Sequence, residues 1–592
     1  MSEFLPSRLA LAAVEPYRIP QFERAGYLRL DVNEHPGGAP DYVVAAVHDA
    51  LSAEKIATYP NYAEWHAEAA AWFGVAADQL TCTAGGDEAI KAICEAHLLP
   101  QKSLVTLDPG YDMFKIWAQL YGNPLQGVAL GPQFAFDKSA WIQAITAENV
   151  GLIALVTPNN PTGTLCPREI IVETLERVQI PVVIDETYAE FVDATVADLL
   201  PKYRHLFIIR SFSKVHGLAG LRVGAVLSQA QNIESLRRVL NPFNVNRAAI
   251  AASRAVMAFP AATGLHVLEV TAARTEFVEA LNQMGVETGP AHANFVLANF
   301  GRRAAQVTQA LMQERILIRN RSGSHPRLEG WCRIAIGSPP QMARVAGAIR
   351  KVMAPKPQLQ TLIFDMDGPL VDTSHSYRVA IVATAKELLK GQGAGPHVLA
   401  EVTLERVEML KRRGGLNNDW DCTAALMQDL GGTADLNAIF ETFQRIYWGN
   451  DGDGLISGEP FLVDAVLQSE ISAKYATAIV TGRPRDEAEF ALAANAASST
   501  WPVLFALEDG PAKPAPDGIL HVLQQLERPV AGAAYLGDSV DDMRAARVAG
   551  VAAIGVLPAG QSWDGGLPEA LYAAGAEWVF ASVAEVLAWL RA

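Results

Sequence analysis

A polar segment with two prolines, MAPKPQLQ at 353–360, divides the 592-residue chain into two parts. Short apolar runs alternate with amphipathic stretches on both sides of it: GLIALVT, PVVID and LFIIR before it, and TLIFD, ATAIVTG, AAYLGD and VAAIGV after it. This alternation predicts an α/β fold with a mostly parallel sheet in each part. Because one hydrophobic core does not extend over a chain of this length, we expect two domains, 1–352 and 361–592, joined by a linker at 353–360.

Each predicted domain has a further subdivision. After about residue 242 the first domain predicts a smaller α+β subdomain that ends in WCRIAIG. In the second domain, residues from about 375 to 460 contain no strand-like runs, and segments such as LNAIFETFQRIYWGN favour helices. We therefore expect a helical insertion between the first and second strands of the second domain.

The net charge and the cysteine content indicate which partners and which cellular compartment to expect. The formal net charge of −16 argues against nucleic acid or an anionic membrane as a partner. The absence of a CxxC pair favours a reducing compartment over a disulfide framework for the five cysteines, Cys82, Cys94, Cys166, Cys332 and Cys422. The sequence has no apolar stretch typical of a signal peptide and no run near the ~20 apolar residues of a membrane span. We expect a cytoplasmic protein.

A lysine with unusual neighbours lies in the segment RSFSKVHGLAGLRVG. Ser211 and Ser213 precede Lys214, and Arg222 follows it after a glycine-rich stretch. A lone surface lysine is normally just solvated, and that interpretation does not explain two hydroxyls and an arginine at this spacing. Upstream, TAGGDEAI opens a helix at Gly85, Gly86 and Asp87, where backbone N–H groups can face an anion.

Three other segments of the first part carry polar or aromatic side chains after predicted strands. Asp185 ends the strand PVVID and is followed by Tyr188; taken alone, Asp185 is better explained as a helix N-cap. Asn160 lies in PNNPTG, which alone is a plain turn, and Tyr111 in DPGYDMF, which alone is a half-buried core aromatic. Together these residues supply the amine, the anion, the donors, the flat group and the phosphate cup that pyridoxal phosphate requires.

These motifs give the first ~350 residues a resemblance to fold-type I aminotransferases, and within them to the histidinol-phosphate aminotransferase branch. The motifs occur in the expected order, as NEHP, TYP, GGDE, NNPTG, DETY, SFSK with Arg222, NPFNVN, HANFVL and CRIAIG. Members of the branch more often have Asn-Glu-Asn-Pro where this chain has His35 in the third place. This departure concerns the substrate and leaves the cofactor assignment intact.

The resemblance implies a role for each matching residue. Lys214 would bind the cofactor covalently and move a proton between Cα and C4′, and Asp185 would pair with the ring nitrogen. Asn160 and Tyr188 would hold O3′. Asn33 and Arg333 would bind the substrate, Arg333 at the α-carboxylate of a glutamate donor. The cofactor ring and phosphate would also be contacted by Gly85, Gly86, Asp87, Tyr111, Ser211, Ser213 and Arg222, and, from the neighbouring subunit of a homodimer, by Tyr59.

The second part begins with two aspartates at the end of a strand, Asp365 and Asp367 in TLIFDMDG. In an extended segment residues two apart project to the same side, so both carboxylates can face one cleft. Two carboxylates that close repel each other unless a cation lies with them, and oxygen ligands suit Mg²⁺. Further polar residues follow predicted strands, where open α/β sheets bind ligands: Thr481 in AIVTGRP, Lys513 in AKPAPDGIL, and Asp538 and Asp542 in AYLGDSVDDMRAA.

Each of these second-part motifs has an ordinary explanation as a turn, a cap or a solvated lysine, but their occurrence together and in order favours phosphoryl transfer. Residues 360–592 resemble phosphatases of the haloacid-dehalogenase superfamily with a helical cap inserted after the first motif. The resemblance implies that Asp365 attacks phosphorus, Asp367 acts as general acid and base, and Thr481 and Lys513 hold phosphoryl oxygens. Mg²⁺ would be bound by Asp365, the Asp367 carbonyl and Asp538, with Asp542 in the outer shell.

Two details of the second motif set bear on its activity. An aspartate at 367 favours phosphoester hydrolysis over dehalogenation, which lacks this acid. Pro369 stands where threonine is commoner and removes a hydroxyl beside the site.

The two resemblances predict a bifunctional enzyme. Transamination of imidazole-acetol phosphate with glutamate would give histidinol phosphate, and its hydrolysis would give histidinol, the following step of histidine biosynthesis. Two alternatives remain open at this stage. One is a transaminase or decarboxylase paired with a phosphatase for another amino phosphate in specialised metabolism. The other is a phosphatase-like half that regulates without turnover.

Overall fold

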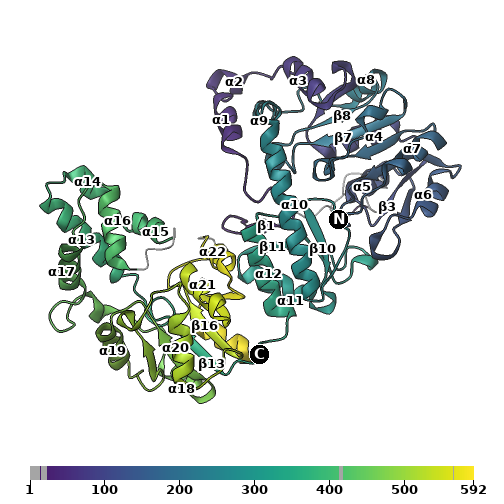
Figure 1. Ribbon diagram of the computed structural model, residues 1–592. Helices are drawn as coiled ribbons and strands as arrows, with labels where there is room; N and C mark the ends of the chain where they lie inside the picture. Colours follow the sequence, from purple (N-terminus) through teal and green to yellow (C-terminus); the bar gives the residue numbers. More distant parts are fainter. Residues whose placement is uncertain (1–13, 15–22, 413–417, 564–565, 592) are drawn as a thin grey trace, which may run out of the picture. The chain divides into compact units, whose positions relative to one another are not determined.

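The protein is described from a computed structural model that covers residue 14 and residues 23–412, 418–563 and 566–591. The chain forms two compact units, Met1–Met342 and Ala343–Ala592 (Figure 1). Helix α12, Pro339–Met353, crosses from one unit into the other.

The first unit contains a seven-stranded sheet in the order β2-β8-β7-β6-β5-β3-β4. Strand β8 is antiparallel to β2 and β7, and the other neighbours are parallel. The strands are β2 (Leu80–Thr83), β3 (Ser103–Asp108), β4 (Leu125–Ala129), β5 (Val150–Val156), β6 (Val182–Asp185), β7 (Leu206–Ser211) and β8 (Gly224–Leu227). The central strands are buried on both faces, which explains their continuous apolar sequence.

Helices cover both faces of this sheet, so the unit has three layers. Alternate strand residues such as Val183 and Ile184 belong to two different cores. One core includes residues of α4 (Gly86–His97), α5 (Asp112–Leu120) and α8 (Ala230–Val239). The opposite core includes residues of α1 (Asp41–Asp49), α3 (Ala63–Phe73), α6 (Lys138–Ile145), α7 (Arg168–Arg177) and α9 (Arg247–Ala258). The short helix α2 spans Ala53–Ala57.

A smaller five-stranded sheet completes the first unit, in the order β1-β11-β12-β10-β9. Its strands are β1 (Leu28–Leu30), β9 (Glu287–Thr288), β10 (Phe295–Asn299), β11 (Ile316–Asn320) and β12 (Trp331–Ala335), accompanied by helices α10 (Pro260–Gln283) and α11 (Ala304–Gln313). Strand β1 precedes every strand of the large sheet in the sequence, yet it belongs to the small sheet, where it pairs in parallel with β11. Helix α9 lies after residue 242 yet packs into the large-sheet core through Ile250 and Val256.

The second unit is built on a six-stranded parallel sheet in the order β15-β14-β13-β16-β17-β18. The strands are β13 (Thr361–Phe364), β14 (Ala476–Val480), β15 (Val503–Phe505), β16 (Ala533–Gly537), β17 (Ala552–Val556) and β18 (Trp578–Phe580). The helices that follow them are α18 (Ala465–Lys474), α19 (Arg485–Ala494), α20 (Asp517–Gln525), α21 (Val540–Ala549), α22 (Leu567–Ala574) and α23 (Val583–Arg591).

A helical cap is inserted between β13 and β14, and the predicted fold class of both parts is confirmed. The cap helices are α13 (Tyr377–Gly391), α14 (Pro396–Ala400), α15 (Leu404–Arg412), α16 (Asp419–Asp429) and α17 (Leu436–Tyr447). They enclose a core of their own that includes Leu389, Met427 and Phe443. The two chain segments that lead into and out of the cap pair with each other, since Asp372 N donates to Pro460 O and Leu462 N donates to Leu370 O. We call this paired crossing, 370–372 with 460–462, the cap hinge.

The C-terminal part of α12 packs within the second unit. The Arg344 guanidinium, 3% exposed, pairs with Glu569 at 2.6 Å. Lys351 donates to the Val579 carbonyl and its own carbonyl accepts from Trp589 Nε1 at 3.2 Å. These contacts make α12 an additional helix of the second unit, although it precedes the first strand β13.

Among the described residues no single helix is long and apolar enough to cross a membrane. Helices α9 and α10 together satisfy the length and composition test, but they meet at a bend of 82°.

Candidate active sites

A cavity of ≈ 130 Å³ lies at the carboxyl ends of strands of the seven-stranded sheet. It brings together most of the first set of predicted site residues: Asn33, Gly86, Asp87, Tyr111, Asn160, Asp185, Tyr188, Ser211, Ser213, Lys214, Arg222 and Arg333. Ligands of parallel sheets bind at this edge because loops from several strands converge there. The remaining lining residues are Val32, Val156, Thr187 and Ala219, which the sequence did not single out.

Lys214 follows strand β7 and is buried in this cavity. Its Nζ atom donates to the Val32 carbonyl at 3.1 Å. Burial and the nearby positive charge of Arg333 lower the pKa of Lys214 to about 8. About a tenth of this amine is therefore uncharged at pH 7, far more than of an ordinary lysine, and able to act as a nucleophile.

Asp185 ends strand β6 and provides a buried carboxylate. Its Oδ1 atom accepts from the Thr187 main-chain N–H at 3.0 Å. Burial raises the pKa of Asp185 to about 6, against the opposing effect of the Thr187 hydrogen bonds. A cationic ligand atom at this carboxylate would favour its charged form again, as a protonated pyridine nitrogen does.

The Tyr188 hydroxyl lies between two side-chain amides. Asn33 Nδ2 donates to it at 3.0 Å and Asn160 Nδ2 at 3.4 Å. Arg333 is held next to them, because it donates to Asn160 Oδ1 at 2.7 Å and to the Asp31 carbonyl at 2.8 Å. The arrangement places hydrogen-bond donors and one guanidinium along one side of the cavity.

The other side of the cavity has the features of a phosphate site. Helix α4 begins at Gly86, so its N-terminal N–H groups are available to an anion. Arg222 donates to Asp87 at 3.1 Å, and the Tyr111 hydroxyl donates to the same carboxylate at 2.8 Å. Gly85 has a φ of +80°, and a Cβ atom there would lie 2.7 Å from an Arg222 nitrogen. The close packing of Gly85 and Arg222 therefore requires glycine.

Tyr59 lies outside the lining of this cavity. Its ring is 76% exposed and stacks on Phe243 with the centroids 4.3 Å apart. An exposed pair of aromatic rings of this kind suits a contact with another molecule.

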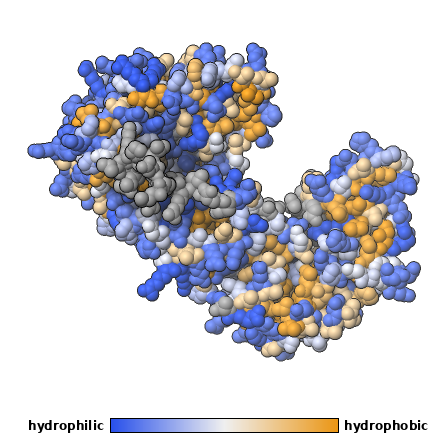
Figure 2. Space-filling view, turned by 180° about the vertical axis from the view of Figure 1, so that it is seen from behind, coloured by the Kyte–Doolittle hydropathy of each residue, from blue (hydrophilic) through white to orange (hydrophobic). Residues whose placement is uncertain are grey.

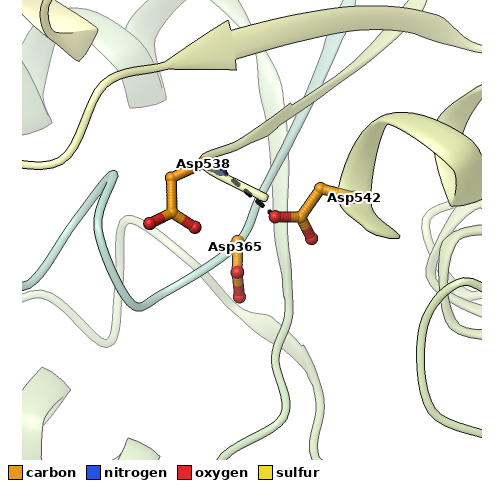
Figure 3. Close-up of side chains that lie close together, drawn as sticks. All are labelled: Asp365, Asp538 and Asp542. Carbon is orange, nitrogen blue, oxygen red and sulfur yellow. Dashed lines mark hydrogen bonds between the residues drawn. The ribbon is translucent and has the colours of Figure 1, made fainter. Parts of the chain in front are cut away.

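The second candidate site is a cavity of ≈ 360 Å³ in the second unit. Figure 3 shows the Asp365, Asp538 and Asp542 carboxylates gathered after strands β13 and β16. Ligand oxygens of the three lie within 4.8 Å of one another, the geometry of a divalent-cation site built from oxygen atoms. Asp367 and Lys513 line the same cavity, so the sheet brings the predicted carboxylates and lysine together.

Lys513 compensates part of the negative charge at this site. Its Nζ atom lies 2.8 Å from Asp365 Oδ2 and 2.6 Å from Asp542 Oδ1. Burial alone would lower the pKa of Lys513, but the two carboxylates raise it well above its usual range. Burial raises the pKa of Asp365 well above its ordinary value, and burial with the neighbouring Asp542 raises the pKa of Asp538 to about 7. A cation in addition to Lys513 would reduce the repulsion between these buried carboxylates and favour their charged forms. The residues therefore fit a bound metal ion.

Asp542 differs from the other two aspartates in its hydrogen bonds. Its Oδ2 atom accepts from Ser539 Oγ at 2.7 Å, Ser539 N at 2.9 Å and Asp538 N at 3.2 Å, the last drawn as a dashed line in Figure 3. This carboxylate is therefore already saturated by protein donors. Such a residue orients its neighbours more readily than it binds a metal directly.

Thr481 is placed differently from the other predicted residues of this site. It is buried after strand β14, and its Oγ1 atom accepts from the Arg483 main-chain N–H at 3.2 Å. The cavity lining there is formed by Gly482 and Pro484.

The cap and helix α19, which follows β14, supply the side of the cavity away from the sheet, and sequence reasoning singled out none of these lining residues. Aromatic rings, carboxylates and amides line it, from α13, α17, α16 and its N-cap residue, and from α19: Tyr377, Asn418, Asp419, Trp420, Phe443, Gln444 and Glu487. The Glu487 carboxylate accepts from Tyr377 Oη at 2.6 Å and from Gln444 Nε2 at 3.0 Å. In the sequence these residues belong only to an amphipathic helical pattern. That pattern does not distinguish a residue that lines a cavity from one that lies in a core.

Two family models match separate parts of the chain. Residues 25–349 match the family model of aminotransferase class I and II, and residues 359–550 match that of the haloacid dehalogenase-like hydrolases. Histidinol-phosphate aminotransferase of Roseiflexus castenholzii is 33% identical over 361 residues, which cover 58% of this chain and 96% of the relative. The Bacillus subtilis protein of the same name is 30% identical over 334 residues, covering 55% of this chain and 91% of that protein.

A solved structure shares the fold of the first unit. Histidinol-phosphate aminotransferase of Sinorhizobium meliloti, solved with pyridoxal-5′-phosphate, has a TM-score of 0.54 and 24% identity. The match covers 60% of this chain and 98% of that chain.

Proposed function

Because the chain belongs to the class I and II aminotransferases and continues into a haloacid dehalogenase-like hydrolase domain, we propose a bifunctional enzyme that makes an amino phosphate and then removes its phosphate. In the first reaction imidazole-acetol phosphate and glutamate give histidinol phosphate and 2-oxoglutarate. In the second, histidinol phosphate and water give histidinol and inorganic phosphate. The observation that carries the proposal is that each unit gathers its candidate reacting groups in one cavity, Lys214 with Asp185 in the first unit and Asp365 with Asp367, Lys513 and Asp538 in the second.

The first cavity suits pyridoxal phosphate as cofactor. When bound, the cofactor supplies an electron sink for the negative charge that develops at the substrate Cα. Lys214, with its lowered pKa, would provide the amine that holds the cofactor and would move the proton at the substrate Cα. Asp185 would pair with the ring nitrogen, and Asn160 and Tyr188, which are hydrogen-bonded to each other, would orient O3′. The phosphate would be held by the N-terminus of α4 with Ser211, Ser213 and Arg222.

Substrate binding in the first site falls to Arg333 and Asn33. The Arg333 guanidinium is buried and fixed by Asn160 and the Asp31 carbonyl, so it is oriented before substrate arrives. A planar guanidinium can bind the α-carboxylate of glutamate with two parallel hydrogen bonds. Because the Arg333 side chain is already fixed, less of its conformational entropy is lost when substrate binds.

In the second site Asp365 is proposed to attack phosphorus, and the bond from phosphorus to the substrate oxygen breaks. Asp367 gives a proton to the leaving oxygen and then takes one from the water that hydrolyses the phosphoryl-aspartate. Lys513 balances negative charge on the phosphoryl oxygens. Asp365, Asp538 and the Asp367 carbonyl would hold Mg²⁺, whose charge stabilises the phosphoryl group, while Asp542 orients Lys513 and Ser539.

The lining of the second cavity supports a small substrate with a flat ring and a positive charge. A volume of ≈ 360 Å³ accommodates a metabolite rather than a phosphorylated protein. Trp420 and Asp419 of the cap helix α16 offer an aromatic face and a carboxylate, and Glu487 of α19 adds a second carboxylate. Histidinol phosphate carries an imidazole ring and an ammonium group, which match these surfaces.

We further propose that the aminotransferase part forms a homodimer, with Tyr59 reaching the partner's cofactor phosphate. Tyr59 is exposed and outside its own cavity. Exposed apolar side chains precede it in the chain: Val44 on α1, Ile56 on α2, and Leu51 between the two helices. Figure 2 shows several patches of hydrophobic surface on the first unit. A second copy of the chain would cover such a surface.

Phosphate release from histidinol phosphate tests the assignment of two independent sites. We expect the wild type to release phosphate with Mg²⁺ present, the Lys214→Ala variant to retain this activity, and the Asp365→Asn variant to lose it. Transamination should show the reverse pattern. Failure of the wild type to hydrolyse histidinol phosphate, with transamination intact, would refute the second half of the proposal.

A further inference from the structure

A fully buried arginine lies directly behind the proposed acid of the phosphatase site. The Arg483 side chain is 0% exposed and does not line the cavity. Its Nε and Nη2 atoms lie 2.6 and 2.5 Å from Asp367 Oδ1. The Asp367 carboxylate is itself 32% exposed and does line the cavity. Arg483 therefore reaches the reaction space through Asp367 and not by direct contact.

The same guanidinium is bonded to the cap hinge region. Its Nη2 atom donates to Glu459 Oε2 at 2.8 Å, and Glu459 directly precedes the hinge residue Pro460. Glu459 Oε1 accepts from Ser376 and from the Tyr447 hydroxyl, the latter at 3.1 Å. Both ends of the cap, before α13 and at the end of α17, thus meet on one carboxylate.

A cap side chain completes the enclosure of Arg483. The Arg483 guanidinium carbon lies 5.1 Å from the centroid of the Tyr377 ring, over the face of that ring. Tyr377 also lines the cavity. The main-chain N–H of Arg483 donates to Thr481, so the arginine is fixed at its backbone as well. A guanidinium held at so many points has little freedom, and a carboxylate bonded to it shares that restriction.

We propose that Arg483 is a positioning residue that aims the Asp367 carboxylate and ties its orientation to the cap hinge through Glu459. The inference rests on the proposed phosphatase function and adds a residue to it. Asp367 is aligned with the leaving oxygen only while Glu459 holds Arg483 in place. A cap seated over a substrate and an aligned acid are then parts of one hydrogen-bonded unit.

A purely structural role for the ion pair makes a different prediction. Buried ion pairs often contribute little net stability, and replacing them affects folding without regard to the substrate. A positioning role instead depends on how much the leaving group needs a proton. Alkyl phosphates need one, whereas a phosphate ester with a good leaving group such as p-nitrophenol does not.

The test compares kcat/KM for an alkyl phosphate and for p-nitrophenyl phosphate in the full-length protein. In Arg483→Met we expect a loss of about 100-fold with the alkyl phosphate and less than about fivefold with the aryl phosphate, in the range that one acid contributes. Arg483→Lys should recover part of the alkyl activity. Glu459→Gln, which leaves the arginine in place, should show the same selectivity with a smaller loss.

Two controls separate positioning from general damage. Arg485→Met removes an arginine two residues away that is 41% exposed and paired with Asp509, and it should change neither substrate's rate. In an Asp367→Asn background Arg483→Met should add no further selective loss, since the acid is already gone. Equal losses with both substrates in Arg483→Met and Glu459→Gln, or full additivity with Asp367→Asn, would overturn the proposal.

The outcome is also distinguishable from failure of the proposed substrate. If the wild type cleaves the two model phosphates and not histidinol phosphate, the substrate assignment fails and the comparison still decides the role of Arg483. If the wild type cleaves no phosphoester at all, both the phosphatase function and the positioning role are refuted.

Discussion

Lys513 Nζ lies 2.8 Å from Asp365 Oδ2, so a positive charge is placed against the proposed nucleophile before any phosphate arrives. Asp542, which is fully buried, holds the lysine from the other side at 2.6 Å. The lysine is thus preorganised, and its charge acts without the cost of moving a side chain during the reaction.

Removing the positive charge of Lys513 should impair phosphate release and leave transamination unaffected. We expect Lys513→Met to lower kcat for phosphate release by about 10²–10³-fold, the range for loss of one preorganised donor. Transamination should stay unchanged. Lys474→Met, which removes a half-exposed lysine paired with Glu470, is the matched control. A Lys513→Met variant with normal phosphate release would contradict the role assigned to this residue.

The lowered pKa of Lys214 predicts how cofactor uptake depends on pH. Only the uncharged amine reacts with the cofactor aldehyde, and the amine loses its proton as pH rises through about 8. The rate of pyridoxal phosphate uptake by the cofactor-free protein should therefore rise through that pH and then level off. Stopped-flow absorbance measures it.

A variant tests the cause of the Lys214 shift. Since Arg333 contributes to the lowered pKa, Arg333→Gln should move the rise in uptake rate to higher pH. An uptake rate that is constant between about pH 6 and 10 would show that the Lys214 amine does not titrate there.

Gly85 offers a test of the phosphate side of the first site. In Gly85→Ala the new methyl would strain a φ of +80° and displace Arg222, and we expect the Kd for pyridoxal phosphate to rise at least about tenfold. Gly74→Ala is the control, because it has a φ of +68° with open space around it. Equal affinities in the two variants would remove the argument for this phosphate site. Equilibrium titration followed by fluorescence gives both constants.

The packing of α12 predicts that the phosphatase part needs this helix. A fragment of residues 339–592 keeps the Arg344–Glu569 pair, and a fragment of residues 361–592 loses it. Loss of one partner of a buried ion pair costs about 3 kcal/mol, which lowers the Tm of a unit this size by about 6–12 °C. Thermal unfolding of the two fragments measures the difference. Arg344→Met in the full chain should destabilise the second unit, while Arg350→Met, at an exposed arginine, should not.

The sequence predicted the parts of the fold that depend on local pattern. Continuous apolar runs such as VGLIALV gave the buried parallel strands, and the absence of such runs after Asp372 gave the helical cap. Residues at or just after strand ends could be grouped within each unit because parallel strands end at one edge, which placed Asp185 with the first site and Asp538 with the second.

Features that depend on contacts between distant segments were not predictable in this way. Trp420 and Phe443 line the phosphatase cavity, but their helices carry no motif that distinguishes them from core aromatics. Arg483 meets Asp367 across 116 positions, and only the folded sheet brings them together. Strand β1 joins a sheet whose other members lie more than 250 residues later, a long-range pairing that local periodicity does not encode.

The path of α12 has a consequence for how such a protein can be taken apart or recombined. The family match of the first part extends to residue 349, whereas the compact second unit already begins at residue 343. The inherited boundary and the folding boundary therefore do not coincide. A recombination that cuts the chain at the proline-containing segment 353–360 would separate the phosphatase domain from α12, a helix that packs against it. The aminotransferase domain left behind would keep the C-terminal end of α12 without the surface on which that end packs.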